Sequence, residues 1–453
     1  MQSLFLLAVF CGLTFMGFSA AFAAALGFIW VDIVKPQQIA YAIINGWPLS
    51  FMSAIAMIGL FILKDRKHAP RFTTLLALIA MLAIWITFTT SMSDFPERAW
   101  LKWDWVSKVV IFALIFPYIF RSRIQMEAFI LVFIFAAATI FFSAGVKTLR
   151  GGGGYGVLAI MGASNTGLAE SSTLAVVSVM LIPLILFIMR HSIILPRNIW
   201  TWCFCIAMIV VALAAVVGTS ARTGVIAVIV LCVISLFKSQ RKMLWIGGLV
   251  IAGVVIMNLD LSNTSWGARM STIETYDADS SALGRIKVWE WTLQFVSSHP
   301  LGGGFDSYMH NRILGVTSDG IINYIPEGAI GGKAFHSIYF EVLGEQGFPG
   351  FIMYFSMIVL TLLKLHSLKK KWRKHEGMAW MVTLADALTT GILIFLAGGA
   401  FVGIAYQPFI FYLVSLTVAM DQYTVRIEKE ALKEKRLMEA KNRAIAQQHP
   451  VNI

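Results

Sequence analysis

The chain has 453 residues, of which 58% are hydrophobic and 13% are charged. A typical soluble domain is about 45–50% apolar and about 25% charged, so this composition excludes a soluble enzyme, a secreted disulfide scaffold and a disordered chain. The net charge of +12 comes from basic residues in short runs between apolar segments, which is typical of cytoplasmic loops. The sequence therefore predicts a polytopic membrane protein without a nucleic-acid partner.

A membrane-spanning helix needs about 20 apolar residues, and about twelve segments of the chain qualify. The first segment is long enough to be a broken helix or two short helices around Gly17. We expect an all-α integral membrane protein of about 12 transmembrane helices. In chain order the predicted spans cover about 4–33, 48–63, 72–90, 105–120, 125–143, 172–189, 199–217, 223–237, 243–258, 349–364, 379–398 and 400–420.

The spans divide the chain into four predicted regions. Residues 1–258 form an N-terminal transmembrane bundle of about nine helices, and residues 259–348 form one large outer loop with short amphipathic helices. Residues 349–420 form the last transmembrane helices, and residues 421–453 form a charged tail. Most of the 36 basic residues lie in alternate loops and in the tail, so the positive-inside rule places both termini in the cytoplasm and the large loop outside.

A Gly- and Ser-rich stretch and a short arginine motif come first among the candidate functional segments. The stretch 150–172 offers Asn165 and Glu170 as polar contacts for a bulky ligand, or is only a spacer. Arg222 lies between two apolar runs, and a charge at membrane depth costs about 2.5–3.5 kcal/mol on insertion scales, so such a residue usually faces a cavity or a partner. A short solvated loop that holds this arginine among lipid headgroups explains the position equally well.

The outer loop contains a pattern typical of an amphipathic helix. Ile286, Trp289, Leu293 and Val296 recur at helical spacing and predict a helix at the membrane interface, with tryptophan anchors. This helix either caps the bundle or has a binding role. Arg285 stands at its start, where a guanidinium group and a helix N-terminus together offer N–H donors to a phosphate.

The end of the outer loop contains a histidine before another helical pattern. His336 can act as a general base near neutral pH, although a lone histidine is more often structural. Glu341 and Glu345 follow one turn apart and either orient the histidine loop or pack at the lipid interface. The sequence contains no HExxH, paired CxxC, P-loop or GxSxG motif, so we expect no metal site, ATPase or α/β-hydrolase.

These segments together resemble the O-antigen ligase and polymerase superfamily of membrane glycosyltransferases. The resemblance is strongest in RIKVW…HPLGGG (285–304) and HSIYFEVLGEQGFPG (336–350), and it extends to TSARTG (219–224) and SNTGLA (164–169). The first hundred residues look like the O-glycosylation ligase subgroup that is associated with exosortase systems. The resemblance implies a GT-C-like fold in the bacterial inner membrane, with an active site that faces the periplasm.

The resemblance also implies a reaction and roles for residues. A glycan would move from undecaprenyl diphosphate to an acceptor hydroxyl on lipid A–core or on a protein, without a metal or another cofactor. By position, His336 would be the catalytic base, and Arg222 and Arg285 would hold the lipid diphosphate. Glu341, Glu345 and Asn165 would have supporting roles.

Two alternatives to a ligase remain open. A polymerase would use the same lipid-linked donor with a carrier-linked oligosaccharide as its acceptor, and no motif separates the two activities. A transporter of the same glycolipid belongs to a different class. Transporters tend to have internal repeats, and the sequence shows no convincing repeat.

Overall fold

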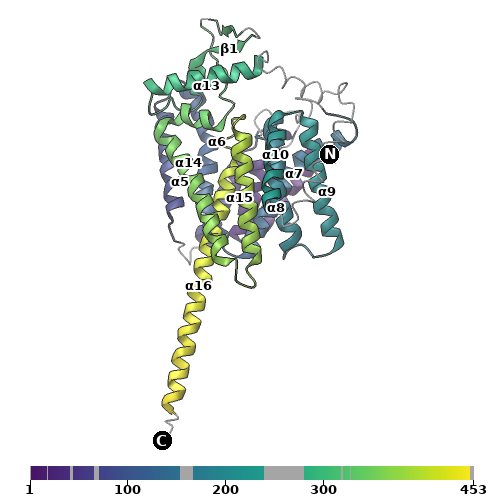
Figure 1. The fold of residues 1–453 in the computed structure, drawn as a ribbon, viewed down its shortest axis with the longest axis vertical. Coiled ribbons are helices and arrows are strands. Elements are labelled where there is room, and N and C mark those ends of the chain that lie inside the picture. Colours follow the sequence, from purple (N-terminus) through teal and green to yellow (C-terminus); the bar gives the residue numbers. More distant parts are fainter. Residues whose placement is uncertain are drawn as a thin grey trace.

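The computed structural model describes residues 2–17, 19–40, 44–65, 71–153, 167–238, 280–317, 320–326 and 328–448. Long helices stand side by side in a bundle, a small layer of helix and sheet covers one end of it, and one helix projects far beyond the other end (Figure 1). The structure is thus nearly all-α, as predicted, with a short two-stranded sheet that the sequence did not predict. The end of the bundle that carries this layer of helix and sheet is the outer end.

The first half of the bundle contains the helices up to residue 149. They are α1 (Gln2–Gly17), α2 (Ala21–Val34), α3 (Pro36–Ile39), α4 (Leu49–Leu60) with a π-helical turn (Phe61–Asp65), α5 (Thr74–Ser91), α6 (Pro96–Ile119) and α7 (Arg123–Leu149). Side-chain caps explain where two of them begin. Thr73 accepts a hydrogen bond from the Leu76 amide at α5, and Ser122 with Gln125 forms a capping box at α7.

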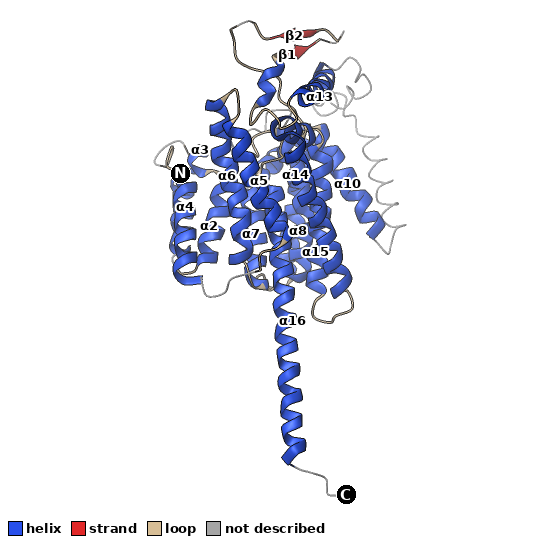
Figure 2. Ribbon diagram, turned by 90° about the vertical axis from the view of Figure 1, so that its left-hand side faces the viewer, coloured by secondary structure: helices blue, strands red, loops and turns tan. Residues whose placement is uncertain are grey.

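The second half begins at residue 171. Its helices are α8 (Ser171–His191), α9 (Ile199–Thr219), α10 (Arg222–Lys238), α13 (Ser280–Ser298), α14 (Ile338–Trp372), α15 (Ala379–Gly399) and α16 (Pro408–Gln448). A short 3-10 helix (Ser307–Asn311) and the antiparallel strands β1 (Ile313–Val316) and β2 (Ile322–Tyr324) lie between α13 and α14. Figure 2 shows the two strands above α13 at the outer end.

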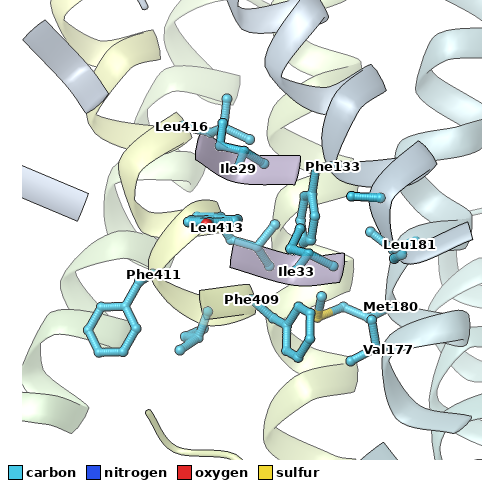
Figure 3. Packing of buried hydrophobic residues seen from close by; sticks show 14 of the residues in the cluster. Ile29, Ile33, Phe133, Val177, Met180, Leu181, Phe409, Phe411, Leu413 and Leu416 are labelled. Atoms are coloured by element: carbon cyan, nitrogen blue, oxygen red, sulfur yellow. The ribbon is translucent and has the colours of Figure 1, made fainter. Parts of the chain in front are cut away.

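A continuous apolar core joins helices from both halves of the chain. Ile33 of α2, Phe133 of α7, Met180 of α8 and Phe409 of α16 belong to one cluster of buried residues (Figure 3). These side chains are buried, and aromatic pairs such as Phe133 with Phe409, whose ring centroids are 6.3 Å apart, fill the space between the helices. The core therefore fixes α16, near the C-terminus, against helices from the first 150 residues.

Six of the described helices are long and apolar enough to cross a membrane. They are α5, α7, α8, α9, α14 and α15, which correspond to six of the predicted spans. Leu4–Gly17 and Leu49–Lys64 are apolar but shorter, and the predicted span 243–258 lies outside the described residues. The prediction of twelve spans is therefore confirmed only in part, and the four region boundaries stay predictions.

The first predicted span is two antiparallel helices. Gly17 of α1 faces Ala24 of α2, and Gly27 of α2 faces Leu13 of α1, so the small residues let the two helices pack closely. The turn between them lies near Lys64, whose ammonium donates to the Ser19 carbonyl. The first described helix, α1, begins toward the outer end, and α16 ends beyond the other end (Figures 1 and 2), which differs from the predicted arrangement with both termini on one side. The side of the membrane on which each terminus lies stays a prediction.

The predicted helix of the outer loop is present, and part of its surface is buried in the protein. Val288 packs against Phe335 and the sheet, and Phe295 and Val296 pack near Leu343 of α14. Ile286 and Leu293, predicted to face the membrane interface, are 39% and 55% exposed. The two tryptophans are also not simple headgroup anchors, since the Trp289 indole donates to the Phe335 carbonyl at 2.8 Å and Trp291 stacks on Phe295.

A kink in α14 receives the glycine-rich segment that follows α13. Gly347 has φ +63° and interrupts the helix, and Gly302 of the segment has φ +85°. A Cβ on Gly302 would lie 2.4 Å from the Gly347 nitrogen, so only glycine fits at this contact. Hydrogen bonds from the amides of Gly303 and Gly304 to the carbonyls of Gly344 and Glu345 hold the segment in place. The outer half of α14 is thereby fixed to the outer layer.

Candidate functional site

Several helices that carry candidate residues begin close together at the outer end. A Cβ on Gly224 of α10 would lie 2.8 Å from the Ala175 Cβ, one turn into α8. A Cβ on Gly398 of α15 would lie 2.5 Å from the side chain of Val176, the next residue of α8. A Cβ on Gly399 would lie 2.8 Å from the side chain of Ile338, the first residue of α14. These close approaches bring the N-termini of α8, α10 and α14 to one region, and helix N-termini favour anions.

His336 stands in a fixed loop directly before α14. Its backbone is left-handed, with φ +49°, a conformation that is uncommon outside glycine and occurs at functional sites. The neighbouring residues hold the loop: Trp289 donates to the Phe335 carbonyl, and the Asn311 side chain bonds to both the amide and the carbonyl of Lys333. The imidazole is therefore presented from a well-defined position.

The electrostatic surroundings keep His336 neutral. Burial lowers the pKa of His336 to about 4, and the nearby cations Arg285 and Lys333 add to this shift. Lys333 crosses the start of α13, because a Cβ on Gly284 would lie 2.5 Å from the Lys333 Cε. At neutral pH the imidazole is thus uncharged and able to accept a proton, with two cations beside it.

Glu170 lies on another side of Arg285, directly before α8. Burial raises the pKa of the Glu170 carboxyl, whereas a hydrogen bond from Thr173 at 3.1 Å and the charge of Arg285 lower it. Arg285 therefore interacts electrostatically with both Glu170 and His336. The structure brings together a base, a carboxylate and two cations from three separate segments of the chain, since Lys333 and His336 share one loop.

Arg222 and Asn165 are the remaining predicted site residues outside the glutamate pair. Arg222 is the first residue of α10, whose first turn packs against the first turn of α8, so it joins the same end from the neighbouring helix. Asn165 lies outside the described residues. Arg285 and His336 are thus brought together directly, and Arg222 is placed by helix packing.

Glu341 and Glu345 form a buried ionic network with Lys102 of α6. The Lys102 ammonium lies 3.0 Å from Glu341 and 2.8 Å from Glu345, and the side chain of Glu345 is fully buried. The amide of Ala405 donates to Glu341, and the amide of Asp306 donates to Glu345. The two carboxylates therefore join α6, α14 and two loops inside the protein, whereas packing at the lipid interface was the role favoured from sequence.

A large cavity adjoins the His336 region. Its volume is about 940 Å³, within the range of ligand pockets. It reaches Glu170 and Gly403, the second of which lies against Glu341. Arg222, Arg285 and His336 do not line it among the described residues. Its wall is formed by residues from α2, α3, α4 and α6, from the start of α8, and from the loops that contain Asp306 and Gln407.

Sequence reasoning missed the basic residues Lys102, Arg98 and Lys333. Arg98 and Lys102 line the cavity and Lys333 flanks His336. The dense mixture of charged and aromatic residues at 98–105 was a signal that a predicted span begins beside a polar site. Within the described residues there is no group of three or more His, Cys, Asp or Glu side chains that could hold a metal ion.

Two family models match the chain. Residues 1–193 match a family of unknown function (DUF5935), and residues 207–355 match the O-antigen ligase family. Arg222, Arg285, His336, Glu341 and Glu345 all lie in the second match. No curated protein matches the chain. The resemblance predicted from the sequence is thereby confirmed at the level of the superfamily, and the exosortase-associated subgroup stays a prediction.

Proposed function

We infer from the match of residues 207–355 to the O-antigen ligase family that this protein is a ligase-type membrane glycosyltransferase with a lipid-linked glycan as donor. The finer proposal is that it moves a glycan from undecaprenyl diphosphate to an acceptor hydroxyl on lipid A–core or on a protein. The observation that carries it is the fixed loop that presents His336, with Lys333 against the start of α13 and Arg285 close to the imidazole, since glycosyl transfer needs a base next to a site for diphosphate.

The proposed reaction is a displacement at the anomeric carbon. The acceptor hydroxyl loses its proton to the neutral imidazole of His336 as its oxygen bonds to the anomeric carbon. The bond between that carbon and the phosphate oxygen breaks, and the electron pair leaves with undecaprenyl diphosphate. The products are the glycosylated acceptor, the free lipid diphosphate and a protonated histidine that returns its proton to water.

The cations stabilise the leaving group. Arg285 and Lys333 lie beside His336, and Arg222 begins the helix next to α8. Guanidinium groups bind phosphate oxygens through two parallel hydrogen bonds, and a charge-assisted hydrogen bond contributes about 1.5–3 kcal/mol. As negative charge grows on the diphosphate in the transition state, these groups stabilise it more strongly than the ground state.

The distribution of charge supports an orientation for the site. The charged tail of α16 projects from the end opposite α13 (Figure 1), and Arg121 and Arg71 lie at that end, where their carbonyls accept from Arg426 and Gln422 of α16. By the positive-inside rule this end faces the cytoplasm. We therefore propose that the protein lies in the bacterial inner membrane with the His336 region facing the periplasm.

A reconstituted transfer assay tests the proposal. Purified protein in lipid vesicles receives undecaprenyl-diphosphate-linked glycan and, separately, lipid A–core or a candidate protein acceptor, in buffer with EDTA. We expect wild-type transfer, complete loss in His336→Ala, and retention in His299→Ala, a control at an exposed histidine of the same outer layer. Full activity of His336→Ala, or a loss of activity in EDTA, would contradict the mechanism.

The products separate the alternative activities. Transfer to lipid A–core or protein identifies a ligase for that pair. Lengthening of the carrier-linked glycan alone identifies a polymerase with the same chemistry. Glycolipid binding without any new glycosidic bond refutes the enzyme and favours a transporter.

A further inference from the structure

The cavity has a wall that the proposed reaction does not use. This N-terminal wall consists of Asp32, Lys35, Gln37, Gln38, Asp104 and Trp105, which all line the cavity. They come from α2, α3 and α6, within the 193 residues that match the family of unknown function. The cavity also reaches Glu170, whose carboxylate interacts with Arg285 of the proposed active site. The wall therefore shares one cavity with a carboxylate that interacts with a cation of the proposed active site.

Two amide side chains of this wall present unsatisfied acceptors. Within the described residues, the side-chain oxygens of Gln37 and Gln38 are buried and accept no hydrogen bond. A buried acceptor without a donor is unfavourable, and such groups call for an explanation in the ligand or solvent that the space admits. A ligand with several hydroxyl donors satisfies two neighbouring amide oxygens.

Trp105 adds an aromatic surface to the same wall. The Lys35 ammonium lies 5.5 Å from the centre of its ring. Lys35 itself has a left-handed backbone, with φ +48°, at the junction of α2 and α3, so this junction is held in a strained conformation. Flat aromatic faces beside hydrogen-bonding groups suit ligands that have both an apolar ring face and a polar edge.

The charges of the wall argue against a second phosphate site. Lys35 and Lys108 are accompanied by Asp32 and Asp104, all lining the cavity. Lys108 is paired with Asp104 at 2.7 Å, and Asp32 accepts a hydrogen bond from Tyr412. The carboxylates balance the cations, so the wall as a whole favours a neutral, hydroxyl-rich ligand over an anion.

We propose that the N-terminal wall is a saccharide subsite that binds sugar residues of the transferred glycan or of its acceptor through Gln37, Gln38 and Trp105. The inference rests on the proposed function and extends it, because it assigns a task to the region of unknown function. Sugar residues held there lie in the same cavity as Glu170, which is adjacent to Arg285.

The test compares two cavity variants with a matched control. Gln37→Leu/Gln38→Leu removes both acceptors with little change of volume, and Trp105→Leu removes the aromatic face. Gln422→Leu is the control, because its side-chain oxygen is likewise buried without a donor but lies on α16 near Arg71, away from the cavity. Each variant is purified, its melting temperature is measured, and its KM values are determined separately.

Three substrates distinguish the two sources of sugar. They are undecaprenyl diphosphate with the full glycan, the same lipid with a single N-acetylhexosamine, and the acceptor that works with the wild type. If the glycan of the donor binds at the wall, KM for the full donor rises about tenfold in the cavity variants while KM for the single-sugar donor stays constant. If the acceptor binds there, KM for the acceptor rises about tenfold with either donor.

Other outcomes overturn the inference. Unchanged KM values in both cavity variants, or a fall in kcat alone, refute the subsite even if His336→Ala is inactive and the proposed function stands. An active His336→Ala variant refutes the proposed function instead. Binding of the fluorescently labelled full donor, and separately of the labelled acceptor, to protein in nanodiscs gives the same comparison without turnover. Unchanged Kd values for both in the double variant refute the subsite. Trp105→Leu decides the question if the double glutamine variant does not fold.

Discussion

Replacing Lys102 with methionine tests whether the buried ionic network stabilises the outer end. Lys102 lies 3.0 and 2.8 Å from the two carboxylates, and its side chain is 15% exposed, while that of Glu345 is fully buried. At an effective dielectric constant of about 20, each of these contacts has a gross attraction of about 6 kcal/mol. Removal of the ammonium from water and repulsion between the carboxylates offset much of this sum.

The net loss of folding stability in Lys102→Met therefore depends on the two buried carboxylates that remain without a cation. Breaking a buried ion pair by removing one partner costs about 3–5 kcal/mol, because it leaves uncompensated buried charge. We expect the melting temperature to fall by roughly 5 °C or more, since 1 kcal/mol corresponds to about 2–4 °C in chains of about 150–250 residues. Purified variants in the same detergent are compared by thermal unfolding monitored with size-exclusion chromatography.

Two further variants make this result specific. Lys108→Met, on the same helix, removes a surface pair whose side chains are 31% and 64% exposed, and exposed pairs contribute only about 0–1 kcal/mol. Lys102→Met combined with Glu341→Gln and Glu345→Gln removes all three charges and keeps oxygens that accept from the Ala405 and Asp306 amides. We expect the triple variant to regain most of the lost stability. The reasoning fails if Lys102→Met melts at the same temperature as Lys108→Met, or if the triple variant is the least stable.

Further predictions concern the histidine and the kink. Arg285→Ala removes a cation that lowers the pKa of His336, so this pKa rises and the acidic limb of the kcat/KM profile moves to higher pH. The wild-type profile stays flat down to about pH 5. A wild-type profile in Lys287→Ala would show that the shift belongs to Arg285. Arg285→Lys regains only part of the activity, because an ammonium cannot form the bidentate contact, and full activity would contradict this assignment. Gly347→Ala places a Cβ 2.3 Å from the Pro300 carbonyl oxygen at φ +63°, so it destabilises the protein by about 1–3 kcal/mol, whereas Gly315→Ala, which meets nothing within 4 Å, melts like the wild type.

The sequence predicted those parts of the fold that depend on local apolar pattern. Long apolar runs marked the helices α5, α7, α8, α9, α14 and α15. The same pattern left open whether the first run is one broken helix or two short helices, because hydropathy alone does not fix the turn near Ser19. It did not reveal which part of α13 is buried in the protein, since Val288 and Phe295 are covered by the sheet, by Phe335 and by Leu343, which follow later in the chain.

The sequence indicated only those candidate site residues whose chemistry is recognisable from their local sequence. Arg285 and His336 stood out because an arginine at a helix start and a histidine before a helix have recognisable chemistry. Lys102 did not, because its partners lie 239 and 243 residues later and nothing local to it indicates two carboxylates. The neighbours of a charge in a membrane protein are set by tertiary packing, and a single sequence carries no direct record of that packing.

The contact between Gly302 and Gly347 has a genetic consequence. Each glycine brings its backbone against the backbone of the other, so a side chain at either position meets main-chain atoms that no substitution can make smaller. A second substitution across the contact therefore cannot compensate for the first, since the partner residue is already glycine, the smallest residue. A suppressor screen on Gly347→Ala should yield reversion to glycine or distant stabilising changes, and no partner exchange at residue 302. The two positions are thus constrained as a pair that cannot co-vary.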